Sequence, residues 1–302
     1  MNKSWTKMSF IDKVRWRNLH PIMNSWYFAD KILAKDIARQ RAPECKVARI
    51  LQIPKLQDID INTLPKSYVF KANHGSGSYI KVNDGRNVKT GEKVTNSMLI
   101  NEGKQWLSRI FHWGKEKQYI PIVPRVFFEE YLIGFQEFRC FCFDGAARFI
   151  MVDSARSGEI KSSIYDRDWH RIKAQWRDPA GSDIAKPKNL RKLINTVDKL
   201  AADIDFVRID VYAKENDIYF GEFTFTPNSG RGSINPPEYD KLWGSYWTSD
   251  MAERLELKIP KGVKKISMSS RLYMKTYMNA SLLSRGGIYV LKKCGNFFVP
   301  NS

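Results

Sequence analysis

Residues 205–230 read DFVRIDVYAKENDIYFGEFTFTPNSG, and this stretch decides the fold. Apolar and polar residues alternate on both sides of the polar turn at 214–217, which is typical of a hairpin of two half-buried strands. If the numbers of paired positions sum to about 432, Asp210 lies opposite Glu222 and Arg208 opposite Thr224. These four side chains then share one face of the hairpin, and the other face carries Ile209, Val211, Phe223 and Phe225.

The two facing acids of this hairpin are a candidate metal site. Carboxylates opposed across a strand pair lie about 5 Å apart and repel each other. A cation between them relieves the repulsion, and Mg²⁺ commonly takes one or two carboxylates together with substrate phosphates. A register slip of one residue would separate Asp210 from Glu222. The alternative interpretation is a solvated hairpin face that carries ordinary charges.

A glycine-rich loop lies upstream, between two predicted strands. Residues 68–71 read YVFK, the loop 73–78 reads NHGSGS, and a second apolar stretch follows at 79–82. Glycine leaves backbone N–H groups open to a ligand, and successive N–H groups can cradle phosphate oxygens. Lys71 is placed to neutralise phosphate charge beside the loop. The loop lacks the GK[ST] ending and following helix of a Walker motif, and an ordinary Gly/Ser turn with a surface lysine is the alternative.

A third element combines acidic residues with a connector. Residues 125–132 read RVFFEEYL, Ile133-Gly134 follows, and a strand at 137–143 is joined by an Asp144-Gly145 turn to a strand at 148–152. In the strand at 137–143, Cys140 and Cys142 share one face with Phe138, whereas Glu137 lies on the other. A connector with free backbone donors and acceptors can hold an adenine, and a nearby carboxylate can bind ribose hydroxyls.

The order of these parts resembles the ATP-grasp superfamily and, more narrowly, the TupA-like ATP-grasp proteins, which are named for teichuronopeptide synthesis. Four passages carry the resemblance: LPKSYVFKANHGSGSYIKVND (64–84), FFEEYLIGFQEFRCFCFDGAARFIMVD (127–153), YDRDW (165–169) and the hairpin at 205–230. The upstream ADKILAKDIAR (29–39) fits the usual lead-in of the family. The resemblance runs from about Ala29 to Trp247.

The resemblance implies a role for each matching residue. The implied phosphate contacts are Lys31 and Lys71, with Gly75, Ser76, Gly77 and Ser78 as the closing loop. The implied adenine and ribose contacts are Glu129, Glu130, Leu132 and Glu137. Asp210, Glu222 and Thr224 would bind Mg²⁺, while Arg208 and Lys71 would act on the transferred phosphoryl group. Thr224 stands where ligases of the D-alanine type have Asn, although the narrower family also has Thr there.

The activity implied by the resemblance is that of an ATP- and Mg²⁺-dependent ligase. Such an enzyme phosphorylates a carboxylate and lets an amine displace the phosphate, which forms an amide. The implied substrate is a carboxylate-bearing saccharide or amino acid, in surface-polysaccharide or cell-envelope synthesis. Two alternatives stay open: an ATP-grasp phosphotransferase that acts on a sugar hydroxyl, and a non-catalytic protein that binds polyanions.

The expected fold class is α+β, an ATP-grasp fold in which two α+β subdomains grip ATP. We expect a helical N-terminal segment (1–63), a lid subdomain (64–132), a core subdomain with the metal site (133–247) and a basic C-terminal extension (248–302). A helix is predicted near 188–203, because apolar residues recur there at helical spacing. The stripe that this helix should bury comprises Leu190, Leu193, Ile194, Val197, Leu200 and Ala201.

The chain of 302 residues is strongly basic, with a formal net charge of +18. From Met251 to Ser302, ten basic residues face two acidic ones. This tail is either a solubilising face or a contact for an anionic lipid surface, an acidic polymer or a nucleic acid. Basic and apolar residues alternate along the tail as in an amphipathic helix, so a membrane surface is the favoured partner and a nucleic acid the least expected one.

Cysteine use and hydropathy bear on location. The four cysteines, Cys45, Cys140, Cys142 and Cys294, show no C-x-x-C spacing, and the pair on one strand face fits buried reduced thiols. The sequence has no apolar run of 18 residues, which argues against a transmembrane helix. We therefore expect a cytoplasmic protein, with peripheral contact at the inner membrane face as the possible addition.

Overall fold

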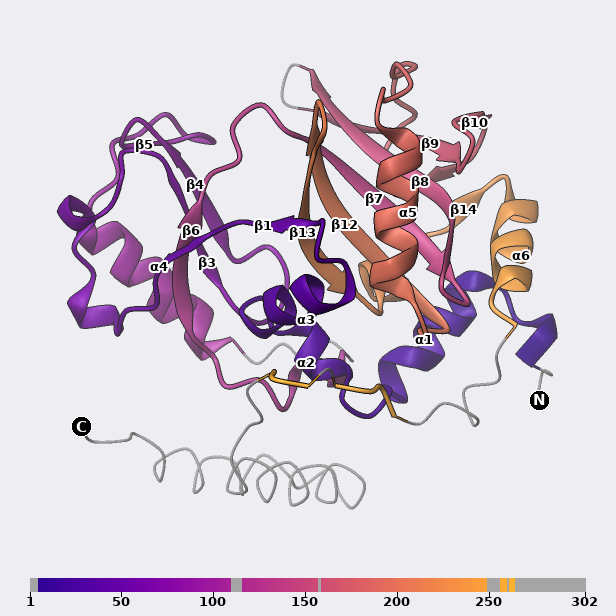
Figure 1. The fold of residues 1–302 in the computed structure, drawn as a ribbon, viewed down its shortest axis with the longest axis horizontal. Helices are drawn as coiled ribbons and strands as arrows, with labels where there is room; N and C mark the ends of the chain where they lie inside the picture. The colour runs from indigo at the N-terminus through magenta and orange to yellow at the C-terminus, as the bar shows by residue number, and fades with distance from the viewer. Residues whose placement is uncertain (1–4, 110–115, 157–158, 249–255, 260, 264–302) are drawn as a thin grey trace. The chain divides into compact units, whose positions relative to one another are not determined.

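A seven-stranded sheet forms the larger part of the fold in the computed structural model (Figure 1). The structure describes residues 5–109, 116–156, 159–248, 256–259 and 261–263. β1 pairs with its neighbour in parallel, and the other pairs are antiparallel. In spatial order the strands are β1 (Lys46–Val47), β13 (Asp217–Thr224), β12 (Phe206–Lys214), β7 (Gln136–Phe143), β8 (Ala146–Arg156), β9 (Glu159–Asp166) and β10 (Arg171–Ile172).

A second, five-stranded sheet carries the glycine-rich loop. In spatial order its strands are β2 (Ile50–Gln52), β6 (Val126–Glu130), β3 (Tyr68–Ala72), β4 (Tyr79–Asn83) and β5 (Arg86–Asn87). All of its pairs are antiparallel. A short two-stranded ribbon, β11 (Gln175–Trp176) with β14 (Ile234–Asn235), completes the sheet structure among the described residues.

Six α-helices of the described residues flank the sheets (Figure 1). α4 packs against the five-stranded sheet at β3, where Phe70, Trp106 and Phe128 form an aromatic core. α5 packs against β12, β8 and β7 of the larger sheet, and α1 packs against α6. The helices are α1 (Phe10–Leu19), α2 (Ser25–Ala29), α3 (Leu33–Arg41), α4 (Asn96–Ser108), α5 (Leu190–Ala201) and α6 (Pro237–Tyr246).

The architecture confirms the predicted α+β class and the predicted strands around the glycine-rich loop and the acidic hairpin. The predicted helical stripe of α5 is also confirmed, since all six of its residues are buried. Cys140 and Cys142 are buried and unpaired, as their shared strand face indicated.

The N-terminal segment does more than the expected helical lead-in. It supplies β1 to the larger sheet and β2 to the smaller one, so it connects the two sheets. At the other end, Glu256 and Leu257 of the expected extension pair with Met23. Most of the basic tail, including everything after Val263, lies outside the described residues, and its membrane contact stays a prediction.

The hairpin of β12 and β13 has the predicted register at the two acids. Asp210 pairs with Glu222, and Arg208 pairs with Thr224. One step further along, Val211 pairs with Phe220, so Gly221 is left over as a bulge. The two acids therefore share one face, whereas Ile209 and Val211 are fully buried on the other.

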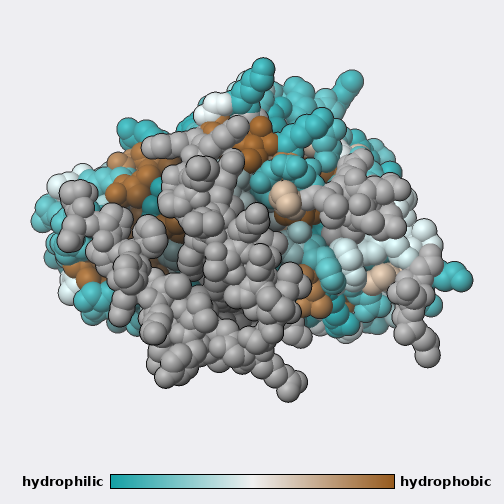
Figure 2. All heavy atoms as spheres, turned by 90° about the horizontal axis from the view of Figure 1, so that it is seen from below, coloured by the Kyte–Doolittle hydropathy of each residue, from teal (hydrophilic) through white to brown (hydrophobic). Residues whose placement is uncertain are grey.

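The described surface carries apolar side chains in separate places. Figure 2 shows one face of the molecule, on which hydrophobic residues form several small groups among hydrophilic ones. Large apolar side chains that are exposed include Leu19, Met23, Val88 and Ile160, from different parts of the chain. Among the described residues, no helix combines the length and the apolar character needed to cross a membrane.

Candidate active site

Arg208 holds the two acids of the hairpin together. Its Nε donates to Asp210 Oδ1 at 2.6 Å, and its Nη2 donates to Asp210 Oδ2 at 2.6 Å. The same Nη2 reaches Glu222 Oε1 at 3.0 Å and Thr224 Oγ1 at 3.1 Å. The Thr224 hydroxyl in turn donates to Glu222 Oε1 at 2.9 Å. All four predicted residues thus form one hydrogen-bonded cluster on the face of the sheet.

The protonation of the two acids differs because their surroundings differ. Burial raises the pKa of Asp210 to about 7, and the Arg208 guanidinium only partly offsets this effect. Burial also acts to raise the pKa of Glu222, but Lys31 and Arg208 outweigh it, so that the pKa of Glu222 falls below its usual value. Glu222 therefore stays ionised at neutral pH, and a cation that approaches Asp210 favours its ionised form.

The acid cluster fits a hard divalent cation. It offers two carboxylates and one hydroxyl, and oxygen ligands are the ones that Mg²⁺ prefers. Asp210 is almost fully buried, whereas the Glu222 side chain is 32% exposed and accessible from the cleft. A bound ion would share these carboxylates with Arg208. Asp210, Glu222 and Thr224 are accordingly the residues that could hold magnesium.

Lys35 and Lys71 both pair with the carboxylate of Glu129. Glu129 Oε1 accepts from Lys71 Nζ at 2.5 Å, and Glu129 Oε2 lies 2.8 Å from Lys35 Nζ. Burial acts to raise the pKa of Glu129, but the two lysines lower it to about 2. The Glu129 carboxylate is thus ionised and fixes Lys71 in place. The resemblance implied that Glu129 contacts the adenine, and this role stays a prediction. In the structure the Glu129 side chain contacts Lys35 and Lys71.

Lys31 joins the glycine-rich loop to the acidic hairpin. Its Nζ donates to the Gly75 carbonyl at 2.5 Å and lies 3.8 Å from Glu222 Oε2. Burial lowers its pKa, and Glu222 opposes that effect. Of the predicted phosphate lysines, Lys31 therefore reaches the acids directly, while Lys71 reaches Glu129.

A buried hydrogen-bond network positions Lys31. The Asp30 carboxylate accepts from the backbone of Ile32 and Leu33, at the start of α3, and from the Asn73 side chain at 2.9 Å. The Lys31 backbone N–H donates to the Asn73 carbonyl at 2.9 Å. Asn73 is the first residue of the glycine-rich loop, so these bonds fix Lys31 relative to that loop.

The glycine-rich loop closes one side of a cavity of about 160 Å³. Gly75 and Gly77 have φ values of 66° and 74°, which residues with a side chain rarely adopt. The backbone of Ala72 donates to the Ser78 carbonyl and closes the loop at its base. The loop therefore depends on glycine at both positions.

The cavity brings together most of the residues that the sequence predicted. The predicted residues that line it are Lys31, Lys71, Ser76, Gly77, Ser78, Glu129, Glu137 and Glu222. Arg208 and Thr224 lie next to it through their bonds to Glu222, and Asp210 is bound to Arg208. Gly75 does not line the cavity, but its carbonyl accepts a hydrogen bond from Lys31, which does. Glu130 and Leu132 are not among the lining residues, and the Glu130 backbone instead donates to the Arg49 carbonyl.

Sequence reasoning missed several residues of this site. Lys35 lines the cavity and pairs with Glu129, and its position four residues after Lys31 was the available signal. Tyr212 lines the cavity and donates to Glu137 Oε1 at 3.3 Å; it follows Asp210 by two positions and so lies on the same strand face. Phe127 also lines the cavity, although nothing in its apolar strand pattern indicated that role.

One protein-family model covers most of this chain. The model of a family described as TupA-like ATP-grasp matches residues 12–248. No match was found among curated proteins.

Solved structures with similar folds include ligases. D-alanine–D-alanine ligase from Bacillus anthracis is 18% identical over 76% of this chain and 67% of that one, with a TM-score of 0.43. The corresponding enzyme from Helicobacter pylori is 13% identical over 74% and 58%, with a TM-score of 0.40. N5-carboxyaminoimidazole synthetase from Staphylococcus aureus, solved with ADP, is 15% identical over 68% and 46%, with a TM-score of 0.38. The chain thus spans about half to two thirds of the length of these enzymes.

Proposed function

Because this chain belongs to the TupA-like ATP-grasp family, we propose that it is an ATP- and magnesium-dependent ligase that joins a carboxylate to an amine. One observation carries the proposal. Lys31, Lys71 and Glu222 line one cleft beside the glycine-rich loop, and Arg208 lies next to it, where it binds both Glu222 and Asp210. Such a cluster suits the transfer of a phosphoryl group between two anions.

The residues of the cleft account for the first chemical step. A substrate carboxylate and a triphosphate repel each other, so their approach needs concentrated positive charge. Lys31 and Lys71 would contact the phosphates, and Arg208, fixed by hydrogen bonds to three residues, would face the transferred group. Magnesium held by Asp210 and Glu222 would supply charge neutralisation at the phosphate oxygens. The carboxylate oxygen bonds to the γ-phosphorus and ADP leaves.

The second step forms the amide. The amine attacks the carbonyl carbon of the acyl phosphate, inorganic phosphate leaves, and the nitrogen loses a proton. Water would hydrolyse the acyl phosphate, so the site must exclude it while the intermediate exists. The loop from Gly75 to Ser78 is positioned to do so, since it covers one side of the cavity.

We also infer that the loop moves when ATP binds. Its volume of about 160 Å³ is below the ~300–1,000 Å³ of typical small-molecule sites. ATP therefore requires the glycine-rich loop to swing away from the hairpin and to close again. The bond from Lys31 Nζ to the Gly75 carbonyl would break in that opening, and the phosphates would replace the carbonyl as its partner.

The substrate class rests on the family resemblance. We place the carboxylate on a saccharide or an amino acid, in the synthesis of a surface polysaccharide or another cell-envelope polymer. A cytoplasmic location is part of this proposal, because the reaction consumes ATP.

The substitution Glu222→Gln tests the metal site and the reaction together. It keeps the size of the side chain but removes the charge, so ATP-dependent turnover should fall at least ~100-fold, as on loss of a preorganised electrostatic group. Turnover is measured as Mg²⁺-dependent phosphate release with a panel of carboxylates and amines. Glu215→Gln is the matched control, because Glu215 lies in the exposed turn of the same hairpin. Near-normal turnover of Glu222→Gln would remove Glu222 from the metal site.

The same assay separates a ligase from a phosphotransferase. A ligase needs an amine before it releases phosphate and amide. A phosphotransferase releases ADP, gives a phosphorylated product and needs no amine. The second result would keep the ATP site and overturn the amide-forming step.

A further inference from the structure

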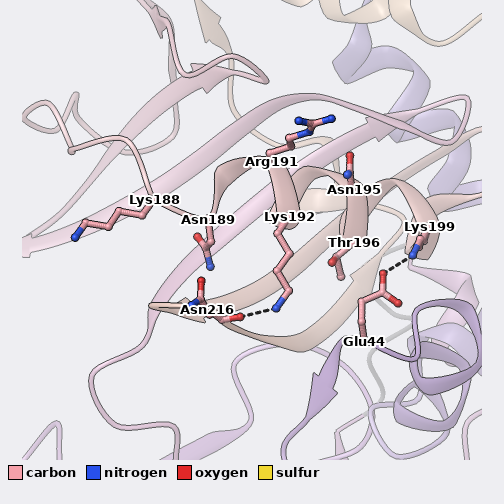
Figure 3. A pocket seen from close by; sticks show the side chains of 9 residues that line it. All are labelled: Glu44, Lys188, Asn189, Arg191, Lys192, Asn195, Thr196, Lys199 and Asn216. Atoms are coloured by element: carbon pink, nitrogen blue, oxygen red, sulfur yellow. Dashed lines mark hydrogen bonds and ion pairs between the residues drawn. The ribbon is translucent and has the colours of Figure 1, made fainter.

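A second cavity lies outside the ATP site. It has a volume of about 500 Å³ and follows the solvent-facing side of α5, next to the turn between β12 and β13 (Figure 3). None of its lining residues lines the ATP cavity. It is therefore a separate feature that the proposed reaction does not use.

The lining of this cavity is basic. Lys188, Arg191, Lys192 and Lys199 contribute positive charges, and Glu44 contributes the one negative charge among the lining residues. Glu44 pairs with Lys199 at 2.6 Å, at the far end of the helix. The charges nearest the start of α5 are thus not neutralised by an acid in the lining.

The basic residues near the start of α5 keep their charge available. Lys192 Nζ donates to the Asn216 carbonyl at 2.7 Å, which positions the ammonium without cancelling its charge (Figure 3). Within the described ranges, Lys188 and Arg191 make no side-chain hydrogen bond or ion pair. Three cations therefore line the cavity near the start of α5, and Figure 3 shows the Lys192 side chain directed toward Asn216 while Lys188 and Arg191 extend to either side.

The N-terminus of α5 opens at this same end. The helix begins at Leu190, and the backbone N–H groups of Arg191 and Lys192 lie in its first turn, where a helix offers them no carbonyl. The aligned peptide dipoles add a partial positive charge at this end. A twelve-residue helix has the length for this effect, and anions commonly bind at such an end.

Asn189 supplies the observation that points to a ligand. It precedes the first turn of α5, yet its side chain makes no capping hydrogen bond. The residue is only 9% exposed, and its Nδ2 has no partner in the described structure. Figure 3 shows its amide directed toward the Lys192 and Asn216 side chains, within the cavity. A buried N–H donor among cations is suited to an anionic oxygen.

We propose that this cavity binds an anion with at least two negative charges, carried by phosphate or carboxylate groups. Asn189 Nδ2 and the first-turn N–H groups of α5 donate to its oxygens. Lys188, Arg191 and Lys192 neutralise its charge. The site is independent of the ATP cleft, so it binds a second ligand and does not take part in phosphoryl transfer.

The test uses the full-length protein with a readout that is local to the site. Pyrophosphate and trigalacturonate are titrated separately into ¹⁵N-labelled protein that is saturated with Mg²⁺ and ADP, so that the ATP cleft is filled. The Asn189 side-chain amide and the Arg191 and Lys192 backbone amides should shift together. A response to pyrophosphate alone identifies phosphate as the ligand group, and a response to trigalacturonate alone identifies carboxylate.

Three variants test whether the anion binds at this site. Asn189→Asp removes the donor and adds a negative charge, and it should weaken anion binding at least about tenfold. Aspartate at this position favours the helix N-terminus, so the variant should remain folded. The double variant with Lys188→Ala and Lys192→Ala should weaken anion binding by a similar factor. Lys104→Ala, on the exposed side of α4, removes an equal type of charge elsewhere and should leave binding unchanged.

Two outcomes would overturn the proposal. One is the absence of any shift of the Asn189, Arg191 and Lys192 amides with either anion. The other is an equal affinity in wild type and Asn189→Asp, or an equal loss in Lys104→Ala, since either result means general attraction to a basic surface. ADP binding serves as the folding control for every variant.

Discussion

His74 is a titratable residue that the loop keeps away from water. It is 3% exposed, and burial lowers its pKa to about 4, with a further lowering by the nearby Lys31 ammonium. A free histidine titrates near pH 6.5. The folded protein thus keeps His74 neutral at a pH where the unfolded chain has bound a proton.

This difference predicts a pH-dependent stability. As the pH falls from about 6.5 toward 4, the unfolded state takes up a proton that the folded state rejects, so folding stability is lost, by up to about 3 kcal/mol. His74→Gln should remove this dependence. Urea unfolding of both proteins at several pH values between 7 and 4.5 measures it, with the exposed His20→Gln as control. Parallel stability curves for wild type and His74→Gln would contradict the buried neutral histidine.

Gly77 offers a second residue-scale prediction. A Cβ built on Gly77 meets no atom within 4 Å, so the cost of Gly77→Ala comes from its φ of 74° alone. That cost is about 1–2 kcal/mol. Relief of the strain would also reshape the loop, and we expect a higher KM for ATP.

Gly91→Ala is the matched control for this substitution. Its φ is 76° and its Cβ also meets nothing, but it lies outside the ATP cavity. Both variants should lose a similar stability in urea unfolding, whereas only Gly77→Ala should show the raised KM. An equal KM in the two variants would mean that the loop does not contact the nucleotide.

At the scale of elements, the hairpin of β12 and β13 shows how far the sequence could be interpreted. The alternation of apolar and polar residues predicts which side chains share a face, and the assumed register that pairs Asp210 with Glu222 is the one that the structure shows there. The bulge at Gly221 was not predicted. It depends on the close approach of this glycine to Asp210 and Tyr212 of the neighbouring strand, which periodicity does not reveal.

Other parts of the fold were beyond sequence reasoning for related reasons. β1 and β2 have two and three residues, too few for a pattern to show. The pair of Lys35 with Glu129 joins α3 to β6, two elements that are far apart in the chain. Local patterns therefore predicted strands and their faces, while long-range pairs required the assembled fold.

The bulge itself gives an element-scale prediction. A Cβ on Gly221 would lie 2.9 Å from the Asp210 carbonyl oxygen and 3.0 Å from the Tyr212 ring. Because the nearest atom belongs to the backbone, Gly221→Ala must shift the two strands, at a cost of about 1–3 kcal/mol. The shift would separate the acids, so Mg²⁺-dependent turnover should fall along with the denaturation midpoint. A variant with both values unchanged would show that the bulge does not set the position of Asp210.

At the scale of the whole molecule, buried charged side chains join α1 to the segment before β12 and to the end of α6. Arg17 of α1 lies 2.5 Å from Asp205, just before β12, and both side chains are 1% exposed. Trp247, after α6, donates its Nε1 to the same carboxylate at 3.0 Å. Lys13 Nζ donates to the carbonyls of Gly244 and Trp247 at 2.7 and 2.8 Å. These bonds join three segments that are far apart in the sequence.

Removal of one partner from this cluster should therefore unfold the molecule more easily without changing its chemistry. Asp205→Ala leaves the Arg17 charge buried without its carboxylate, at a cost of about 3–5 kcal/mol. The double substitution Arg17→Met with Asp205→Leu removes both charges, and it should recover much of that loss. Asp36→Ala breaks an ion pair with Arg39 in which both side chains are about half exposed, so it should cost less than about 1 kcal/mol. Urea unfolding orders the three variants, and the KM for ATP should stay constant in all of them, because none of the substituted residues lines the ATP cavity. If Asp205→Ala cost no more than Asp36→Ala, the buried pair would not be what holds α1 to the sheet.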